Sequence, residues 1–489
     1  MRSQTRAALV VAASSSFLNP YMVSALTVAL PAVGREFHAD AATLSWLTTA
    51  YLLASVICLV PLGRVADLYG RRRVFTLGVV LFVLSSVLCA LAQSTAVLLL
   101  CRVFQGASSA MIFSNGVAML TAVAPPALRG RLLGVTVACV YIGLSLGPVI
   151  GGLLTQGFGW RSVFLGTVPI GLVTFWLAAW YLPREADAPR RGEGLDGPGV
   201  LLYAAMFTGF AIGLSTVPAP ASGWLIAAGL GAGALFVYRS WHVRSPVLDV
   251  RLFQTNRVFA LSGVAALLNY AAGAPSAFLV SLYLQYVKGM SPAHAGAILI
   301  AQPVMQAIVS PAAGWLSERI EPRIVASIGM AMTAGGLAAL AAKPPGPASY
   351  VVGALVVMGA GFGLFSSPNT NAIMSSVPAG AYGVAAGVTS TMRIGGQLLS
   401  FAALTVIFNA FLGAAPVTAA NLDHFRAAAR LGFAVFAAAC GTGVLASLAR
   451  GNLHAGRPAG GPAAGHDEIE VGQSAVPRPA AFRREPTDA

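Results

Sequence analysis

The chain has 489 residues, of which 57% are hydrophobic and only 9% are charged. Soluble domains carry about 25% charged residues, so this composition excludes a water-soluble protein and predicts a surface that faces lipid. The formal net charge of +14 does not indicate a nucleic-acid partner, because the basic residues are divided among many short loops instead of forming one basic face.

Fourteen apolar runs follow one another along the chain, each close to the ~20 residues that a helix needs to cross a bilayer. We expect these spans at residues 7–32, 44–63, 74–92, 97–121, 131–155, 163–182, 198–217, 222–241, 258–286, 292–316, 323–342, 348–374, 384–413 and 430–449. The runs are too long and continuous for the strands of a membrane barrel. The sequence therefore predicts an all-α polytopic membrane protein with 14 spans.

The basic residues predict the orientation of the chain. If the N-terminus lies in the cytoplasm, most of the 30 Lys and Arg residues fall in cytoplasmic loops and few fall outside. This asymmetry follows the positive-inside rule. It predicts a multi-pass protein of the cell membrane (plasma or inner membrane) with both termini in the cytoplasm.

Polar gaps divide the spans into blocks of six, two and six. We expect an N-terminal six-helix half at residues 1–182 and a linker with two extra membrane helices at 183–257. A C-terminal six-helix half is expected at 258–449, followed by a disordered cytoplasmic tail at 450–489. The tail is rich in Gly, Pro and Ala, a composition that favours disorder.

The two halves show weak internal repetition. Gly63 precedes Asp67 by four residues after the second span of one half, as Gly314 precedes Glu318 after the second span of the other. Repeated halves place a substrate site between them, near the middle of the membrane. The sequence therefore predicts a transporter with a central site.

Residues 143–152 carry the most informative pattern of small residues. Gly143, Gly147 and Gly151 recur every four residues, so they lie on one face of a helix. A face without side chains lets a neighbouring helix approach closely. Pro148 removes one helical hydrogen bond and bends the helix. Static packing explains the glycines but not the proline, so we interpret this segment as a moving joint.

Four motifs then resemble the major facilitator superfamily, specifically its fourteen-span drug:proton antiporter (multidrug efflux) branch. They are Gly63 to Arg73, Leu100 to Gly106, Gly143 to Gly152 and Gln285 to Pro292, in the family's order. The resemblance implies the major facilitator fold, with two six-helix halves plus two extra central helices. It also implies conformational or coupling roles for Gly63, Asp67, Gly70, Arg71, Arg72, Arg102, Gly106, Gly143, Gly147, Pro148, Gly151 and Gly152.

Simpler explanations compete with these roles. Arg71 and Arg72 satisfy the positive-inside rule by themselves, whereas Asp67 at its spacing favours a latch between helix ends. Arg102 lies about 8 Å from the predicted outer end of its span. Its side chain either extends to that surface or faces the substrate path. For Arg393, which lies deeper, structural and functional roles are equally supported.

Several polar and aromatic residues fall near the middle of the predicted spans. They are Asn19, Tyr21, Asn115, Asn269, Gln302, Gln306, Asn369, Asn371 and Arg393. Singly, such a residue more often forms a hydrogen bond between helices than it binds a ligand. Together they are candidates for the lining of a polar cavity.

None of the 16 Asp and Glu residues falls near mid-membrane, although membrane-buried acids are typical of proton relays. Where the resembled branch often carries an aspartate, this chain has Met22. A cavity with Asn, Gln and one or two arginines suits a neutral or anionic amphiphile better than a lipophilic cation. Coupling to protons would use Glu36, Asp40 or Asp67 near the span ends, or the substrate's own group.

We therefore expect a secondary active transporter that exports small amphipathic compounds, of the drug or antibiotic efflux type, by alternating access. Protons are the candidate coupling ion, and the expected functional unit is a monomer in the lipid bilayer. One alternative is a metabolite exporter or facilitator without proton coupling. Another, less favoured, is a membrane sensor or subunit that transports nothing. The sequence has no nucleophile–base pair, metal-ligand cluster or phosphate-binding loop, so we expect no enzymatic activity, metal or cofactor.

Overall fold

Fourteen helices that are long and apolar enough to cross a membrane run through the described part of the chain, which confirms the predicted all-α fold. The computed structural model describes residues 3–123, 128–181, 195–243, 246–248, 250–342, 346–377, 382–413 and 415–451. Its helices are α1 (Ser3–Phe37), α2 (Ala41–Tyr69), α3 (Arg71–Ala90), α4 (Thr95–Val123), α5 (Arg129–Phe158), α6 (Arg161–Leu165), α7 (Val168–Tyr181), α8 (Gly197–Ser215), α9 (Ala221–His242), α10 (Arg251–Thr255), α11 (Arg257–Leu282), η2 (Tyr283–Val287), α12 (Pro292–Leu299), α13 (Ala301–Arg319), α14 (Pro322–Ala342), α15 (Ala348–Ser375), α16 (Tyr382–Leu412), η4 (Ala419–Asn421) and α17 (Leu422–Ala449).

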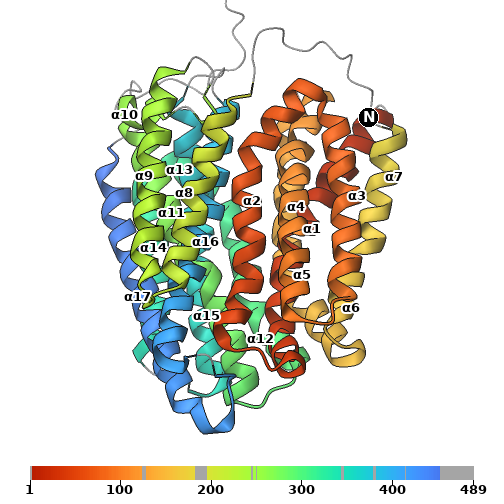
Figure 1. Cartoon of the computed structure of the whole chain (residues 1–489). Helices are drawn as coiled ribbons and strands as arrows, with labels where there is room; N and C mark the ends of the chain where they lie inside the picture. Colours follow the sequence, from red (N-terminus) through yellow and green to blue (C-terminus); the bar gives the residue numbers. More distant parts are fainter. Residues whose placement is uncertain are drawn as a thin grey trace, which may run out of the picture. The chain divides into compact units, whose positions relative to one another are not determined.

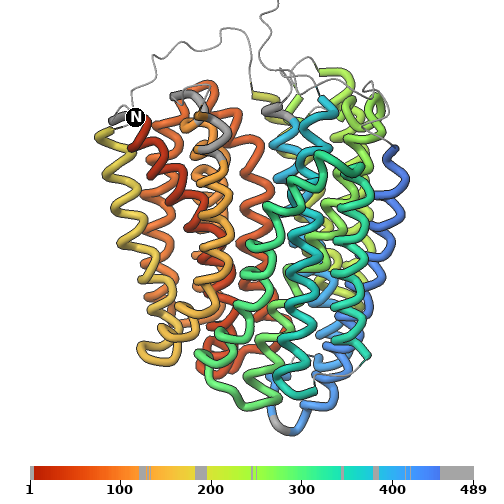
Figure 2. The backbone as a smooth tube through the Cα atoms, turned by 180° about the vertical axis from the view of Figure 1, so that it is seen from behind, coloured from red at the N-terminus to blue at the C-terminus, as the bar shows by residue number. Residues whose placement is uncertain are grey.

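The helices form an N half (α1 to α7) and a C half (α11 to α17), which lie side by side in Figures 1 and 2. Within the N half, α1 packs on α5 and α2 on α4; within the C half, α14 packs on both α15 and α17. The halves meet where α2 contacts α16, where α5 contacts α12 and α13, and where α1 contacts α11. This is the two-half arrangement that the sequence predicted.

Several helices extend beyond their predicted spans, α1 and α17 among them. α1 continues through Pro31 to Phe37, and α17 begins at Leu422, well before residue 430. The first turns of α17 carry Asp423 and Arg426, whose side chains pair at 2.7 Å on the exposed surface. These charges lower the local hydropathy, so the predicted span starts later than the helix does.

Three spans are interrupted along their length. α6 and α7 share one span, as do α12 and α13. α11 passes into the π-helical segment η2 before it ends. π-Helical turns are rare overall and occur preferentially at functional sites. Here η2 contacts α1 of the N half through Gln285.

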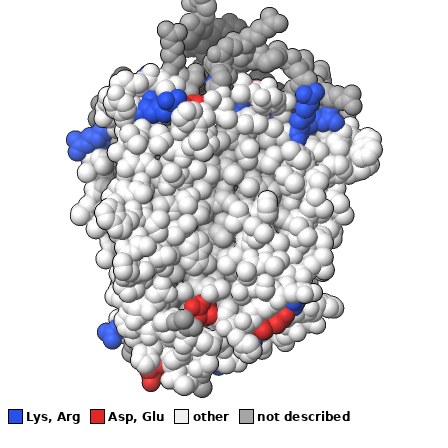
Figure 3. Space-filling view, in the orientation of Figure 1, with Lys and Arg blue, Asp and Glu red and all other residues white. Residues whose placement is uncertain are grey.

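Charged side chains mark the two ends of the helices (Figure 3). We call the end where α1 begins and where Arg71, Arg72 and Arg73 follow α2 the basic end. The other end, which carries Glu36 and Arg161, is called the Glu36 end. Between them Figure 3 shows a broad band without charge on the visible face, as expected of a surface that contacts hydrocarbon.

The two extra helices form a hairpin against the place where the halves meet. Buried residues recur every four positions along α8, at Gly199, Tyr203, Phe207, Ala211 and Ser215, and α8 contacts both α16 and α2. The Tyr203 hydroxyl lies 3.4 Å from Thr391 Oγ1 of α16. α9 packs on α8, and a Cβ at Gly209 would lie only 2.7 Å from Gly229 Cα.

Asp196 fixes the start of this hairpin, so its replacement should destabilise the protein. Its side chain is 2% exposed, accepts the Gly199 N–H at 3.0 Å and pairs with Arg239 Nε at 2.7 Å. We expect Asp196→Ala to cost about 1–2 kcal/mol for the lost cap alone. Thermal unfolding in detergent measures the loss. Asp423→Ala is the control, because that side chain is 91% exposed and its surface pair contributes about 0–1 kcal/mol.

Most of the predicted linker and tail lie outside the described residues. The description stops before residue 182 and resumes at residue 195, and it ends at residue 451. The expected disorder of residues 450–489 and the exact boundaries of the predicted blocks therefore stay predictions.

Candidate functional site

The glycine face of α5 lies directly against α1. A Cβ at Gly143 would lie 2.7 Å from Phe17 O, and a Cβ at Gly151 would lie 2.7 Å from Ala25 Cα. Between them, a Cβ at Gly147 would collide with Ser24 Oγ. The backbones of the two helices therefore touch, as the spacing of these glycines predicted.

The same helix also contacts the C half. A Cβ at Gly152 would lie 2.5 Å from Pro292 O, at the start of α12. A Cβ at Gly296 of α12 would collide with the carbonyl oxygen of Pro148. The segment from Gly143 to Gly152 therefore packs within the N half through one face and against the C half through another.

A second contact between the halves joins α1 to the end of α11. Pro31 has no N–H, so the Thr27 carbonyl lacks its usual helical donor; Ser281 Oγ donates to that carbonyl at 2.9 Å instead. Gln285 Nε2 of η2 donates to Val28 O at 2.9 Å. Because Ser281 satisfies the freed carbonyl, α1 continues through Pro31 without an unpaired acceptor.

A third contact joins α2 to α16. Ser45 Oγ donates to Phe401 O at 3.1 Å, and Thr405 Oγ1 donates to Ser45 Oγ at 3.0 Å. Ser45 lies in the first turns of α2, near the Glu36 end. Together with the contacts of α1 and α12, this bond joins the two halves at the Glu36 end.

The loop after α2 carries the predicted latch residues. Asp67 at the end of α2 accepts from Arg71 Nε of α3 at 2.9 Å, so the pair crosses the turn between these helices. Gly70 between them has φ 100°, a conformation that favours glycine. Arg72 donates to the Ala179 carbonyl and ties α3 to α7. Gly63 faces Ser114 of α4, because a Cβ added at Gly63 would lie 3.7 Å from the Ser114 Cβ.

Arg102 is fully buried inside the N half, so its side chain does not extend to the surface. Its Nε donates to Leu47 O at 3.0 Å, its Nη1 donates to Gln105 Oε1, and its guanidinium lies 4.2 Å from the centre of the Tyr51 ring. Nη2 has no hydrogen-bond partner. All of these partners are neutral. Gly106 allows the close approach of α2, because its Cβ would collide with Tyr51 O.

The candidate lining residues of the N half take different positions. Asn19 is half-buried and accepts from the Tyr51 hydroxyl at 3.0 Å. Tyr21 is buried and stacks on Phe17. Asn115 is buried and donates to the Met111 carbonyl of its own helix. Asn19 is therefore the member of this group that remains partly accessible.

Two candidates of the C half lie inside that half. Asn269 is fully buried and accepts from Cys440 Sγ of α17 at 3.6 Å. Asn369 is also buried and accepts from Arg450 Nη1 at 2.7 Å. Burial lowers the pKa of the Arg450 guanidinium to about 10, which leaves it charged at neutral pH. These contacts connect helices of one half.

The remaining candidates lie on α13, α15 and α16. Gln302 is half-buried, and Asn371 is exposed. The Arg393 guanidinium of α16 lies 4.8 Å from the ring centre of Phe113 of α4, so it bridges the two halves. Gln306 is buried and lies one turn before Ser310 of α13, whose hydroxyl contacts Tyr141 of α5.

Several hydroxyl groups that the sequence did not single out as candidates lie at the same interface. The Tyr141 hydroxyl lies 3.0 Å from Ser310 Oγ of α13, and the Tyr270 hydroxyl lies 3.4 Å from Ser366 Oγ of α15. Ser and Tyr are common in apolar helices, so composition and spacing gave no signal for them. Only the packing of four helices brings them together.

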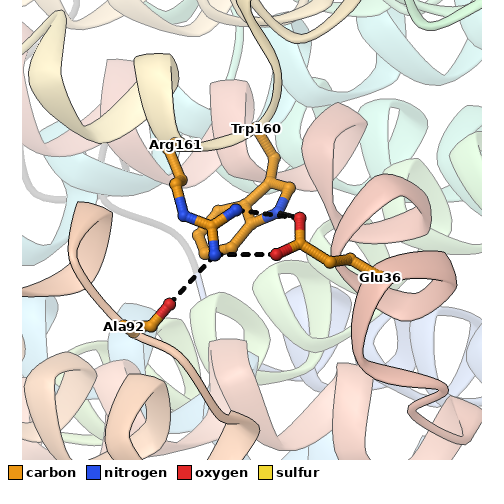
Figure 4. Close-up of polar contacts among 4 residues, drawn as sticks. All are labelled: Glu36, Ala92, Trp160 and Arg161. Atoms are coloured by element: carbon orange, nitrogen blue, oxygen red, sulfur yellow. Dashed lines mark hydrogen bonds and ion pairs between the residues drawn. The ribbon is translucent and has the colours of Figure 1, made fainter.

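Three acids at the ends of N-half helices, Glu36, Asp40 and Asp67, have hydrogen-bond partners, and Figure 4 shows those of Glu36. Glu36 accepts from Trp160 Nε1 at 2.7 Å and from Arg161 Nη1 at 2.8 Å, and Arg161 Nη2 also donates to Ala92 O at 3.1 Å. Asp40 caps α2 by accepting from Thr43 N at 2.8 Å. With Asp67 paired to Arg71, these acids hold the ends of N-half helices in place.

Comparison with known proteins identifies the family. A family model described as Major Facilitator Superfamily matches residues 12–401. The chain is 32% identical over 464 residues to the cephamycin export protein CmcT of Amycolatopsis lactamdurans, covering 92% of this chain and 94% of that protein. It is 29% identical over 409 residues to the riboflavin transporter RibZ of Clostridioides difficile, covering 82% of this chain and 87% of that protein.

A solved structure has the same fold. The crystal structure of a D-xylose–proton symporter superposes with a TM-score of 0.64 at 15% identity, covering 91% of this chain and 97% of that one. The 14 apolar helices, the two contacting halves and the family match agree with one another. The chain therefore belongs to the major facilitator superfamily and is a multi-pass membrane transporter of small molecules.

Proposed function

We propose that this transporter exports small amphipathic compounds from the cytoplasm across the cell membrane by alternating access. The observation that carries the proposal is the position of the contacts between α1, α2, α5 and the C half, which gather at the Glu36 end. The positive-inside rule makes the basic end cytoplasmic, so the Glu36 end faces outward. A carrier that is closed outside faces the cytoplasm, which is the state in which an exporter loads its cargo.

The similarity to a cephamycin export protein supports export of the drug or antibiotic efflux type. We propose that the chain works as a monomer and catalyses no chemical reaction. The roles of the loop, Arg102 and the glycine face as conformational elements remain part of this proposal. A non-transporting sensor is disfavoured by the similarity to export and transport proteins.

The substrate is proposed to be uncharged or anionic. The buried cation Arg102 is held by neutral acceptors, and Met22, where the resembled branch often has an aspartate, is fully buried. A lipophilic cation therefore meets no compensating carboxylate at these positions, and a buried unpaired charge is costly.

The second candidate is a metabolite exporter or facilitator that uses no proton gradient. The engagement of Glu36, Asp40 and Asp67 in pairs and a cap favours it, because these acids are not free to exchange a proton with a substrate. The similarity to a riboflavin transporter also supports a metabolite as the substrate.

Flux into inside-out proteoliposomes tests both candidates. We expect accumulation of the anionic β-lactam cefoxitin or of an uncharged flavone and none of the cation ethidium, because the site offers no carboxylate. An imposed gradient with an acidic lumen should increase the flux if protons are coupled. Flux that is unaffected by the gradient would exclude coupling and favour the facilitator. Accumulation of none of the neutral or anionic compounds would contradict export.

A further inference from the structure

A cluster of hydroxyl and amide groups lies between α5, α11, α13 and α15. We call Tyr141, Tyr270, Gln306, Ser310 and Ser366 the hydroxyl cluster. The Tyr141 and Ser310 oxygens lie 3.0 Å apart, and the Tyr270 and Ser366 oxygens lie 3.4 Å apart. Gln306 lies one turn before Ser310 on α13, and a Cβ at Gly363, three residues before Ser366 on α15, would lie 3.2 Å from Ser310 N. Five neutral polar groups from four helices therefore converge at one place, with one of them on the N half.

Aromatic rings form one wall of the hydroxyl cluster. The Tyr270 ring centre lies 6.1 Å from that of Phe362 and 6.4 Å from that of Phe365. Gly273 on α11 allows this arrangement, since a Cβ there would collide with the Phe362 ring. The rings of Tyr270 and Tyr141 are themselves half-buried. The two tyrosines are therefore the partly accessible aromatic members of the site, whereas Phe362, Phe365 and Ser310 are buried.

The chemistry of the cluster selects a class of ligand. Each hydroxyl and the amide can both donate and accept a hydrogen bond, and none carries a charge at neutral pH. Oxygen atoms attached to an aromatic ring complement such groups, while the ring stacks on aromatic side chains. An ammonium or phosphonium ion would gain no ion pair from these five side chains.

We propose that the hydroxyl cluster binds the phenolic or keto oxygens of an uncharged planar aromatic ligand. This inference rests on the proposed export function and names its substrate class. Tyr141 belongs to the N half and Ser310 to the C half, so a ligand oxygen that replaces their mutual bond contacts both halves. The ligand then substitutes for the Tyr141–Ser310 contact that joins the halves, which links binding to their movement.

Equilibrium binding to the purified full-length protein in detergent tests the proposal without any transport step. The probes are 4′,7-dihydroxyflavone, unsubstituted flavone and tetraphenylphosphonium. We expect the dihydroxyflavone to bind more tightly than flavone by about fivefold for each net hydrogen bond, since one such bond contributes about 1 kcal/mol and tenfold corresponds to about 1.4 kcal/mol. Tetraphenylphosphonium should not compete with it.

Three variants remove the hydroxyl groups, and one removes a similar group elsewhere. Tyr141→Phe, Ser310→Ala and Tyr270→Phe should each bring the affinity ratio of the two flavones towards one, mainly by weakening the dihydroxyflavone. Tyr203→Phe is the matched control, because its hydroxyl bonds Thr391 between α8 and α16; it should leave the ratio unchanged.

The outcomes separate this inference from the export proposal. An unchanged ratio in Tyr141→Phe and Ser310→Ala, or tight competitive binding of tetraphenylphosphonium, would overturn the assignment of the ligand class even if export is measured. A ratio that collapses in these variants supports the assignment even if proteoliposomes show no net flux, in which case export alone is contradicted.

Discussion

Gly147→Leu should reduce transport to the level of empty liposomes while the protein still inserts and folds. The added side chain would enter the space that Ser24 Oγ occupies, where Ser24 bonds Pro20 O at 2.7 Å and Gly143 O at 3.3 Å. Overpacking of this kind costs about 1–3 kcal/mol in a core. The added side chain lies at the α1–α5 contact about which α5 is proposed to move. We therefore expect a much larger loss of flux than of folding stability.

A graded series of substitutions makes this prediction specific. Gly147→Ala should cause a partial loss, because the obstructing Ser24 hydroxyl can rotate away. Gly151→Ala should reduce flux more strongly. Its Cβ would collide with the Ala25 backbone, which cannot move aside as a side chain can. Gly157→Leu on the same helix is the control, because no atom outside its own helix lies within 4 Å of a Cβ there. Full flux in Gly147→Leu would refute the role of this face.

A disulfide between α2 and α16 should stop transport reversibly. In a cysteine-free background, Ser45→Cys with Thr405→Cys places two thiols where hydroxyl oxygens now lie 3.0 Å apart. Oxidation would fix the halves together at the Glu36 end, so one side of the carrier could no longer open. We expect flux to fall to background after oxidation and to recover after reduction with dithiothreitol.

The matched control places a disulfide inside one half. Ser327→Cys with Ser447→Cys replaces a hydroxyl pair 2.9 Å apart between α14 and α17, both in the C half. Since each half is proposed to move as a unit, this disulfide should leave flux unchanged. Equal inhibition by both disulfides would show that internal flexibility of the C half, rather than movement between halves, limits transport.

The sequence predicted the fold well because hydropathy and charge asymmetry act over whole spans. The number of spans and the close packing of Gly143 and Gly151 both follow from local patterns that need no knowledge of partners. The end of α1 did not follow, because the charged Arg35 and Glu36 end the apolar run near residue 32, whereas the helix itself continues to Phe37.

The candidate site was less predictable, because the direction of each side chain depends on contacts with helices that are distant in sequence. Asn269 and Asn369 have the polarity and depth of cavity residues, but the rotation of their helices turns them towards Cys440 and Arg450 within the C half. Rotation about a helix axis depends on packing against all neighbours at once. Conversely, Tyr141 became a candidate only when its contact with Ser310 placed it between the halves.

Paired distance measurements test the central claim, movement of the two halves in opposite senses at their two ends. Spin labels at the exposed positions Arg35 and Lys288 report on the Glu36 end, and labels at Tyr69 and Ile320 report on the basic end. On addition of a transported compound, alternating access predicts that one distance distribution lengthens while the other shortens. Two distributions that both stay fixed, or that lengthen together, would contradict the account.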